Sequence, residues 1–276
     1  MTGNWEWQQD SVPEQSPLIN IWGSSASDVF AVGSEGTIIH YDGSGWCPMV
    51  SNIISHIWGI WGSSGDDVFT AGSAGIILHY DGSEWQRMNE GILPYLRGIW
   101  GSSNRDIFAV GGNGTIQHFD GSEWSTVEID CLAHLWGVWG SSVSDVYAVG
   151  AQGTILHYDG KSWATVPSGT TSFLRRIWGS SGDNIYAVGS GGTILHSDGK
   201  VWKPVSSGTS KDLWGVWGSS GNDVYVVGSG GTVLHYDGSS WSQVSDEKPC
   251  DFWGVWGSSE DDVFLVGTGG GILHSV

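Results

Sequence analysis

Histidine, an acidic residue and a pair of serines recur together along this chain, in a combination that could do chemistry. Each of seven Trp-Gly-Ser-Ser segments is followed by an acid or amide six residues after the Trp and by a histidine eighteen residues after it. Imidazole, carboxylate and hydroxyl groups are the components of nucleophilic catalysis, and histidine is also a common metal ligand. The seven histidines are His40, His79, His118, His157, His196, His235 and His274.

The elements that position these side chains follow from their spacing. The repeated Trp stands at positions 22, 61, 100, 139, 178, 217 and 256, so every interval is 39 residues. A fixed, uninterrupted period is the signature of a repeat architecture. Each unit holds four short runs typical of β-strands, separated by Gly and Ser clusters, and the clearest copy is Leu213–Trp217, Asp223–Gly228, Gly231–Tyr236 and Ser240–Val244. The 45 glycines do not suit helical repeats, so we predict an all-β fold, a seven-bladed β-propeller of four-stranded antiparallel blades.

The two ends of the chain fit into one unit. The last unit stops after its third strand at Val276, and Trp7 takes the repeat position that Trp46 and Trp241 hold in the fourth strand. We therefore expect Asn4 to Gln9 to supply the missing strand. In this interpretation the seventh blade consists of residues 250–276 plus 4–9, and residues 1–276 form a single propeller domain that closes by strand exchange between its ends.

This geometry argues against a catalytic or metal-binding ring of histidines. The histidine lies on the third strand, about 10 Å outside the innermost strand at ~4.8 Å per strand, so equivalent imidazoles diverge from one another. A metal needs its ligands at about 2 Å. We predict instead one structural, buried histidine per blade, hydrogen-bonded to the Ser-Ser pair and to the acid, which is Asn184 in blade 5. We expect no metal and no cofactor.

The tryptophans divide into repeated and non-repeated ones. Fourteen of the 19 stand at two repeat positions that every blade shares, which favours a role in packing. The alternative is one sugar site per blade, built on such a Trp.

The copies disagree in the connection from each outer strand to the next inner strand. One explanation is that these surface loops are unconstrained. However, the residue three before the repeated Trp begins each inner strand beside the central channel, and it is unusually large: Ile19, Trp58, Arg97, Trp136, Arg175, Trp214 and Trp253. Two residues earlier, the aromatic side chains of His56, Tyr95, His134 and Phe173 lie on the same face.

Two interpretations of this ring remain open. Each Arg could stack on a neighbouring indole, at ~0.5–2 kcal/mol per contact, with no ligand involved. Alternatively, the ring forms a concave aromatic mouth for a ligand with an apolar face and an anionic group, such as a glycan or a peptide terminus. The candidate binding residues are Trp58, Tyr95, Arg97, His134, Trp136, Arg175, Trp214 and Trp253.

Composition limits the partners. The chain has 29 acidic against 10 basic residues, a formal net charge of −19, so we expect no nucleic-acid partner. It has no apolar run long enough for a transmembrane helix and no signal peptide, so we expect no membrane insertion. Cys47, Cys131 and Cys250 stand at three different repeat positions, which fits neither a metal knuckle nor a disulfide framework.

The unit Ile-Trp-Gly-Ser-Ser-x-x-Asp-Val-Phe-Ala-Val-Gly-x-x-Gly-Thr-Ile-Leu-His-Tyr-Asp-Gly-x-x-Trp resembles a repeat of many bacterial propeller proteins, commonly of the cell surface. The resemblance covers the whole chain and implies an extracellular or cell-envelope location. The segment from Asp42 to Trp46 is similar to the Asp-box turn of sialidase-type propellers but is one residue shorter. That turn stabilises the fold and does not imply sialidase chemistry.

The His, Ser and Asp arrangement also resembles the tetrad of WD40 blades, a family that implies a binding scaffold rather than an enzyme. We therefore predict a monomeric, non-enzymatic binding module that recognises a glycan or a protein or peptide ligand on the face carrying the variable loops and the channel mouth. The alternatives are a structural or assembly module of a larger surface protein, and a glycan hydrolase or lyase. The third is disfavoured because no carboxylate pair or nucleophile with its base stands out from the repeated background.

Overall fold

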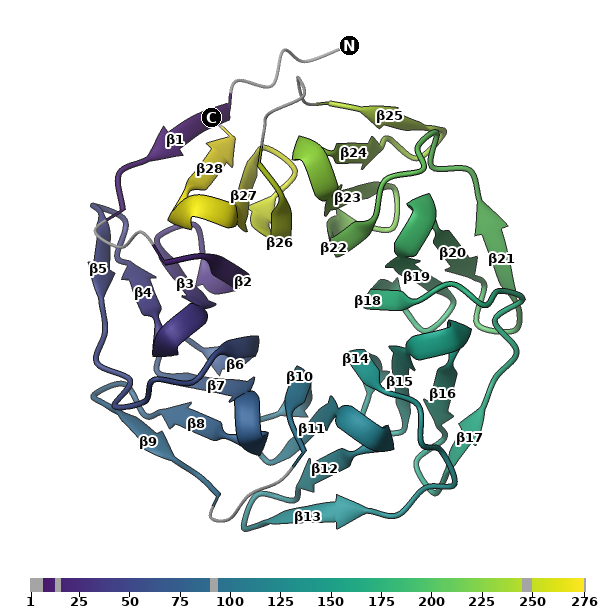
Figure 1. Cartoon of the computed structure of the whole chain (residues 1–276), viewed down its shortest axis with the longest axis horizontal. Helices are drawn as coiled ribbons and strands as arrows, with labels where there is room; N and C mark the ends of the chain where they lie inside the picture. The colour runs from purple at the N-terminus through teal and green to yellow at the C-terminus, as the bar shows by residue number, and fades with distance from the viewer. Residues whose placement is uncertain (1–6, 13–15, 90–93, 245–249, 276) are drawn as a thin grey trace.

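The computed structural model describes residues 7–12, 16–89, 94–244 and 250–275. Within these ranges, 28 strands form seven four-stranded antiparallel sheets that surround a central axis (Figure 1). The predicted seven-bladed β-propeller is confirmed. No helix in the described ranges is long and apolar enough to cross a bilayer.

Each blade runs from an inner strand beside the axis to an outer strand at the rim. The inner strands are β2 (Leu18–Ser25), β6 (Ile57–Ser64), β10 (Leu96–Ser103), β14 (Leu135–Ser142), β18 (Leu174–Ser181), β22 (Leu213–Ser220) and β26 (Phe252–Ser259). The second strands are β3 (Asp28–Gly33), β7 (Asp67–Gly72), β11 (Asp106–Gly111), β15 (Asp145–Gly150), β19 (Asn184–Gly189), β23 (Asp223–Gly228) and β27 (Asp262–Gly267).

The third and outer strands are shorter. The third strands are β4 (Ile38–Tyr41), β8 (Ile77–Tyr80), β12 (Ile116–Phe119), β16 (Ile155–Tyr158), β20 (Ile194–Ser197), β24 (Val233–Tyr236) and β28 (Ile272–Ser275). The outer strands are β5 (Trp46–Pro48), β9 (Trp85–Arg87), β13 (Trp124–Val127), β17 (Trp163–Thr165), β21 (Trp202–Val205), β25 (Trp241–Gln243) and β1 (Trp7–Asp10).

A one-turn 3-10 segment connects the second and third strands of every blade. These segments are η1 (Ser34–Gly36), η2 (Ser73–Gly75), η3 (Gly112–Gly114), η4 (Ala151–Gly153), η5 (Ser190–Gly192), η6 (Ser229–Gly231) and η7 (Thr268–Gly270). They explain why β24 begins at Val233 rather than at Gly231 as predicted. Gly230 and Gly231 have φ values of 59° and 70°, a left-handed conformation that leaves the strand path and that glycine adopts readily.

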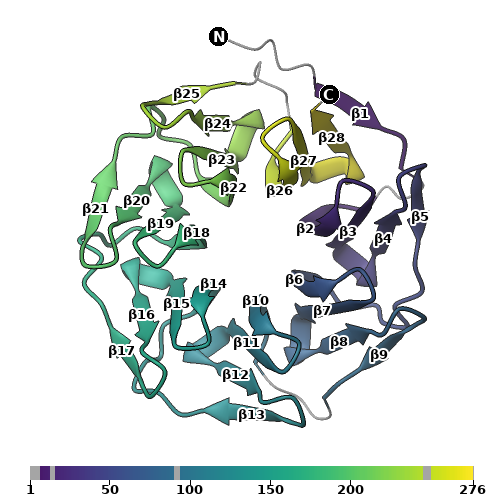
Figure 2. The same cartoon turned by 180° about the vertical axis from the view of Figure 1, so that it is seen from behind.

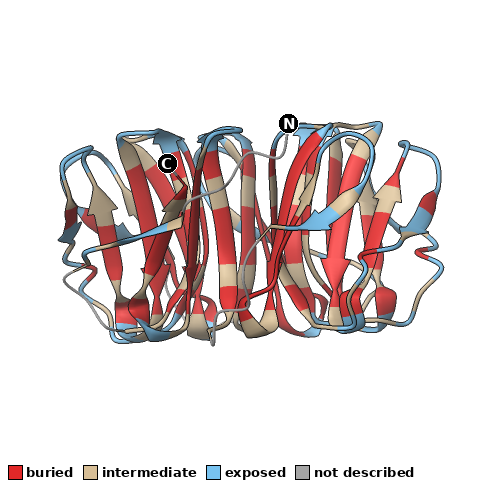
Figure 3. Cartoon of the chain, turned by 90° about the horizontal axis from the view of Figure 1, so that it is seen from above, coloured by how far each residue is buried: buried red, intermediate tan, exposed pale blue. Residues whose placement is uncertain are grey.

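The core lies between adjacent blades. The second strands read as continuous apolar runs, typical of strands that are covered on both faces, and the four residues after the first of β3, Val29 to Val32, are all fully buried. Phe30 and Val32 of blade 1 join one cluster with Ile60 and Val68 of blade 2. Figure 3 shows the buried residues in the middle of each blade, exposed turns along one face, and a mixture of buried, intermediate and exposed residues along the face with the η segments.

The glycine after each repeated Trp is required by this packing. A Cβ on Gly62 would lie 2.6 Å from Cη2 of Trp22 in the preceding blade, and Gly101 stands in the same relation to Trp61. The repeated indole therefore packs across the blade boundary against a residue with no side chain.

The ring closes through β1, which pairs antiparallel with β28 in the register Trp7 to Ser275 and Asp10 to Ile272. The predicted start of this strand, Asn4 to Glu6, lies outside the described residues. The carboxylate of Asp10 also accepts a 2.8 Å hydrogen bond from the indole N–H of Trp46 in blade 1. Figures 1 and 2 show β1 on the outer rim, beside β28, at this seam.

Candidate functional site

The repeated histidine is held by the second strand of its own blade. In six blades its Nε2 lies 2.6–2.7 Å from Oδ1 of the aspartate that opens the second strand. In blade 5, His196 Nε2 lies 2.9 Å from Oδ1 of Asn184. In the six blades with aspartate, the first serine of the Ser-Ser pair donates to the other carboxylate oxygen.

This order of contacts differs from that of a catalytic triad. There the imidazole takes the proton of the hydroxyl and the carboxylate orients the far side of the ring. Here the carboxylate lies between His157 and Ser141, so the imidazole is bonded to Asp145 rather than to the hydroxyl. Among the described residues, no group of three His, Cys, Asp or Glu side chains is placed to hold a metal ion.

Each histidine also stacks on the aromatic residue of the second strand. The ring centroids are 3.8–4.7 Å apart in all seven blades. In the six blades with aspartate, the histidine side chains are 15–29% exposed, so the predicted burial of these histidines is only partial. Burial lowers the pKa of His196, whose partner is an uncharged amide. Burial raises the pKa of Asp223, but hydrogen bonds from His235 and Ser219 outweigh it and leave that pKa below its ordinary value.

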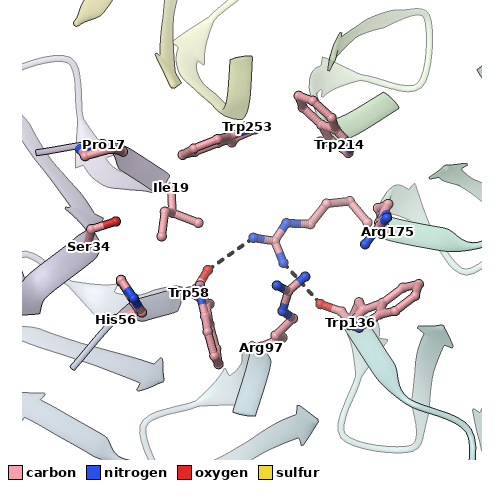
Figure 4. A pocket seen from close by; sticks show the side chains of 11 residues that line it. Pro17, Ile19, Ser34, His56, Trp58, Arg97, Trp136, Arg175, Trp214 and Trp253 are labelled. Carbon is pink, nitrogen blue, oxygen red and sulfur yellow. Dashed lines mark hydrogen bonds between the residues drawn. The ribbon is translucent and has the colours of Figure 1, made fainter. Parts of the chain in front are cut away.

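A cavity of about 380 Å³ lies at the axis on the face that carries the η segments (Figure 4). Every blade contributes to its wall. The lining residues are Pro17, Ile19, Ser34, His56, Trp58, Arg97, Trp136, Arg175, Arg176, Trp214 and Trp253. Six of the eight candidate binding residues therefore meet around one space, which we call the mouth pocket.

The other two candidates, Tyr95 and His134, lie behind this wall. Tyr95 packs edge-on against Trp58 with ring centroids 5.6 Å apart, and His134 lies 5.8 Å from Tyr95. His134 Nδ1 accepts a 3.1 Å hydrogen bond from the backbone N–H of Asn113 in η3. Neither residue lines the mouth pocket: Tyr95 contacts its wall at Trp58, and His134, which is exposed, contacts Tyr95.

Both arginines in the predicted ring stack on the tryptophan of the preceding blade. Cζ of Arg97 lies 5.0 Å from the ring centroid of Trp58, and Cζ of Arg175 lies 4.5 Å from that of Trp136. Arg175 also lies 5.8 Å from the ring of Phe173. One face of each of these two indoles is thus covered by a guanidinium.

The sequence interpretation missed a third cation, Arg176. Its Nη1 donates to the backbone carbonyl of Trp136 at 3.1 Å and its Nη2 to that of Trp58 at 3.2 Å, the two bonds dashed in Figure 4. Asn20 Nδ2 donates to the same carbonyl of Trp58 at 3.1 Å. A signal was present: the residue two before the repeated Trp is glycine in five blades, and Asn20 and Arg176 are the exceptions.

The mouth pocket is positively charged in a strongly acidic protein. Burial lowers the pKa of Arg97, and the charge of Arg175 lowers it further. Burial, together with the charge of Arg97, lowers the pKa of Arg176 to about 10, so this guanidinium remains protonated at pH 7. In the part of the chain that the structure describes, none of the three forms an ion pair with a carboxylate.

The opposite face carries negative charge in its turns between the third and outer strands. The carboxylates of Asp81, Asp120 and Asp237 accept hydrogen bonds from a serine hydroxyl and from two backbone N–H groups two and three residues further on. The serine contact is the largest of the effects that lower the pKa of each to about 2. The two faces therefore differ in charge as well as in sequence variability.

Comparison with known proteins identifies the fold. No protein-family model and no curated protein matches the chain. Among solved structures, YCF48 bound to D1 peptide superimposes with a TM-score of 0.79 at 20% identity, covering 99% of this chain and 95% of that one. YCF48 from Cyanidioschyzon merolae gives 0.79 at 16%, covering 98% of each chain. The WD40 β-propeller domain of Doa1 gives 0.82 at 12%, covering 99% and 97%.

Proposed function

We propose that this protein is a non-enzymatic interaction module that binds a peptide segment of a partner protein in the mouth pocket. The observation that carries the proposal is the mouth pocket itself, in which four indoles and three guanidinium groups, one from blade 3 and two from blade 5, face one space. Tryptophan and arginine are the residues in which protein-binding surfaces concentrate their energy. Concave, largely preformed sites of this size are typical of ligand binding.

A peptide fits the walls better than a glycan does. Sugar rings stack on open indole faces, but Arg97 covers one face of Trp58 and Arg175 covers one face of Trp136. The propeller of YCF48, similar in fold, has been solved with a peptide bound, which supports the same class of ligand here. The described residues that line the mouth pocket include no carboxylate to serve as a general acid or base, so we propose no hydrolase or lyase activity. An extracellular or cell-envelope location remains part of this proposal and rests on the repeat resemblance.

The test is binding of the purified protein to peptide and glycan arrays, followed by affinity measurements on Trp136→Ala. We expect peptide hits, a monomer by size-exclusion chromatography, and a loss of affinity of at least tenfold in the variant, because Trp136 supports Arg175 and lines the mouth pocket. Val201→Ala, an exposed residue outside the mouth pocket, is the matched control and should bind normally. Hits confined to glycans, or an affinity indifferent to Trp136→Ala after correction for unfolded protein, would contradict the proposal. A protein that is oligomeric and binds nothing on either array would favour the alternative role as an assembly module.

A further inference from the structure

Arg176 occupies a position that the fold fills without a side chain. The equivalent residues of blades 2, 3, 4, 6 and 7 are Gly59, Gly98, Gly137, Gly215 and Gly254. Those five blades form the same four-stranded sheets around the same axis. The architecture therefore does not require an arginine in blade 5, although burying a cation without a counter-charge is unfavourable.

The contacts of Arg176 fix its position but leave its charge uncompensated. The two carbonyls that it binds belong to Trp58 and Trp136, the residues on which Arg97 and Arg175 stack. The guanidinium of Arg176 thus connects both cation–π pairs across the axis. Three like charges, those of Arg97, Arg175 and Arg176, therefore surround one cavity. A carbonyl dipole satisfies an N–H group without neutralising the cation, and guanidinium has five N–H donors.

Among the residues that the structure describes, the rest of the mouth pocket offers no anion in return. Its lining residues include no Asp or Glu. The acid whose charge acts on Arg175 is Asp212, and Asp212 Oδ1 already accepts the backbone N–H of Gly191 at 2.8 Å. The Nε–H of Arg175 is buried with no hydrogen-bond acceptor among the described residues. The mouth pocket therefore presents a desolvated donor and an excess of positive charge.

We infer that Arg176 forms, with Arg97 and Arg175, the anion-binding floor of the mouth pocket, and that the group it takes is a carboxylate of the bound peptide. This rests on the proposed function and names the chemistry by which the ligand is recognised. Guanidinium groups bind carboxylates through paired, charge-assisted hydrogen bonds. Within a peptide the carboxylate has two sources, the chain terminus and the side chains of Asp and Glu.

The experiment compares four randomised hexapeptide pools, with a free or amidated C-terminus and with or without Asp and Glu. Their affinities are measured for the wild type, for Arg176→Gly, which restores the residue of the other blades, and for Arg105→Ala. Arg105 is exposed on the opposite face, so its variant controls for the change in net charge. We expect the amidated, acid-free pool to bind at least tenfold more weakly than the best carboxylate-bearing pool. Arg176→Gly should remove that preference, and Arg105→Ala should keep it.

The melting temperature shows whether Arg176→Gly is folded, and Arg176→Gln provides a second variant that keeps a polar, hydrogen-bonding side chain but removes the charge. Binding by the free-acid pool without Asp and Glu identifies the terminus as the source, and binding by the amidated pool with Asp and Glu identifies the side chains. Equal binding of all four pools, or an unchanged preference in both Arg176 variants, overturns the inference while leaving the proposed function intact. Absence of binding by every pool instead contradicts the proposed function.

An independent measurement needs no peptide. Sodium acetate should raise the melting temperature of the wild type above that in sodium chloride at equal ionic strength, in a saturable manner. The rise should be absent in Arg176→Gly and present in Arg105→Ala. The same rise in Arg176→Gly, or no acetate-specific rise in the wild type, overturns the inference.

Discussion

The body of each blade and the mouth of the channel are built from the same seven repeats. The body is nearly uniform, whereas the mouth differs from blade to blade. In the body, the His–Asp–Ser contacts recur in six blades, and the stacked aromatic residue recurs in all seven. At the mouth, the residue three before the repeated Trp is Ile, Trp or Arg.

The difference follows from what each region contacts. A residue in the body meets the next copy of the same sequence, as Trp22 meets Gly62, so a change in one unit must suit its neighbour. A residue at the mouth faces a space shared by all seven blades, where each side chain meets different partners. We therefore expect substitutions in the body to reduce stability and substitutions at the mouth to reduce binding.

The largest effect is expected at the seam, where the body depends on both ends of the chain. Deleting residues 1–10 removes β1, exposes the edge of β28 and removes the acceptor of the Trp46 indole N–H. We expect a loss of roughly 5 kcal/mol or more, or oligomerisation through the open edge, measured by thermal melting and size-exclusion chromatography. Deletion of residues 1–3, which keeps β1, is the control. A monomer with an unchanged melting temperature would show that β1 does not close the ring.

A moderate effect is expected from His157→Ala in the body. The change leaves Asp145 without its imidazole partner and Tyr147 without its stacked ring, and should cost about 1–3 kcal/mol in urea unfolding. Peptide affinity should stay unchanged at temperatures where the variant is folded. Normal stability with lost binding would mean that the repeated histidines, not the mouth, carry the function.

Arg97→Ala and Arg175→Ala test the mouth of the channel, where we expect substitutions to affect binding more than stability. Arg97→Ala removes one cation–π contact and Arg175→Ala removes two, with Trp136 and Phe173, so we expect a stability loss of about 1 kcal/mol for the first and about 1–2 kcal/mol for the second. Each should nevertheless weaken peptide binding at least tenfold. If both variants have much lower melting temperatures and still bind the peptide, the contacts between arginine and aromatic rings at the mouth only stabilise the inner strands.

The smallest effect is expected from Asn184→Asp, which gives blade 5 the acid of the other six blades. Because burial lowers the pKa of His196 in the folded state, the unfolded state binds the proton more readily, and this histidine reduces stability as pH falls below about 6.5. A carboxylate partner favours the imidazolium and should raise that pKa, so the variant gains stability toward pH 5.5, by less than about 1 kcal/mol. NMR titration of His196 and melting at pH 7.5 and 5.5 measure both effects. A pKa that stays low in the variant would contradict this expectation.

The regularity of the repeat makes the fold predictable, since the fixed 39-residue interval and the strand-like runs are enough to define seven four-stranded blades. The start of β24 was not predicted, because a run such as Gly231 to Tyr236 does not reveal that its first residue belongs to a left-handed turn with Gly230. The mouth was partly predictable, because Trp58 and Arg97 depart from a repeated background. Arg176 was missed because its partners are backbone carbonyls, which no sequence pattern displays.

The seam has a consequence for the order of the blades along the chain. Strand β1 joins blade 7 although it lies at the other end of the sequence, so the first and last described ends of the chain belong to neighbouring strands, β1 and β28. A circular permutant that links these ends and opens the chain in the corresponding turn of another blade would keep every sheet four-stranded. By backbone topology no blade is first around the axis, and the blades are told apart by side chains such as Asn184 in the body and, above all, by the residues at the mouth.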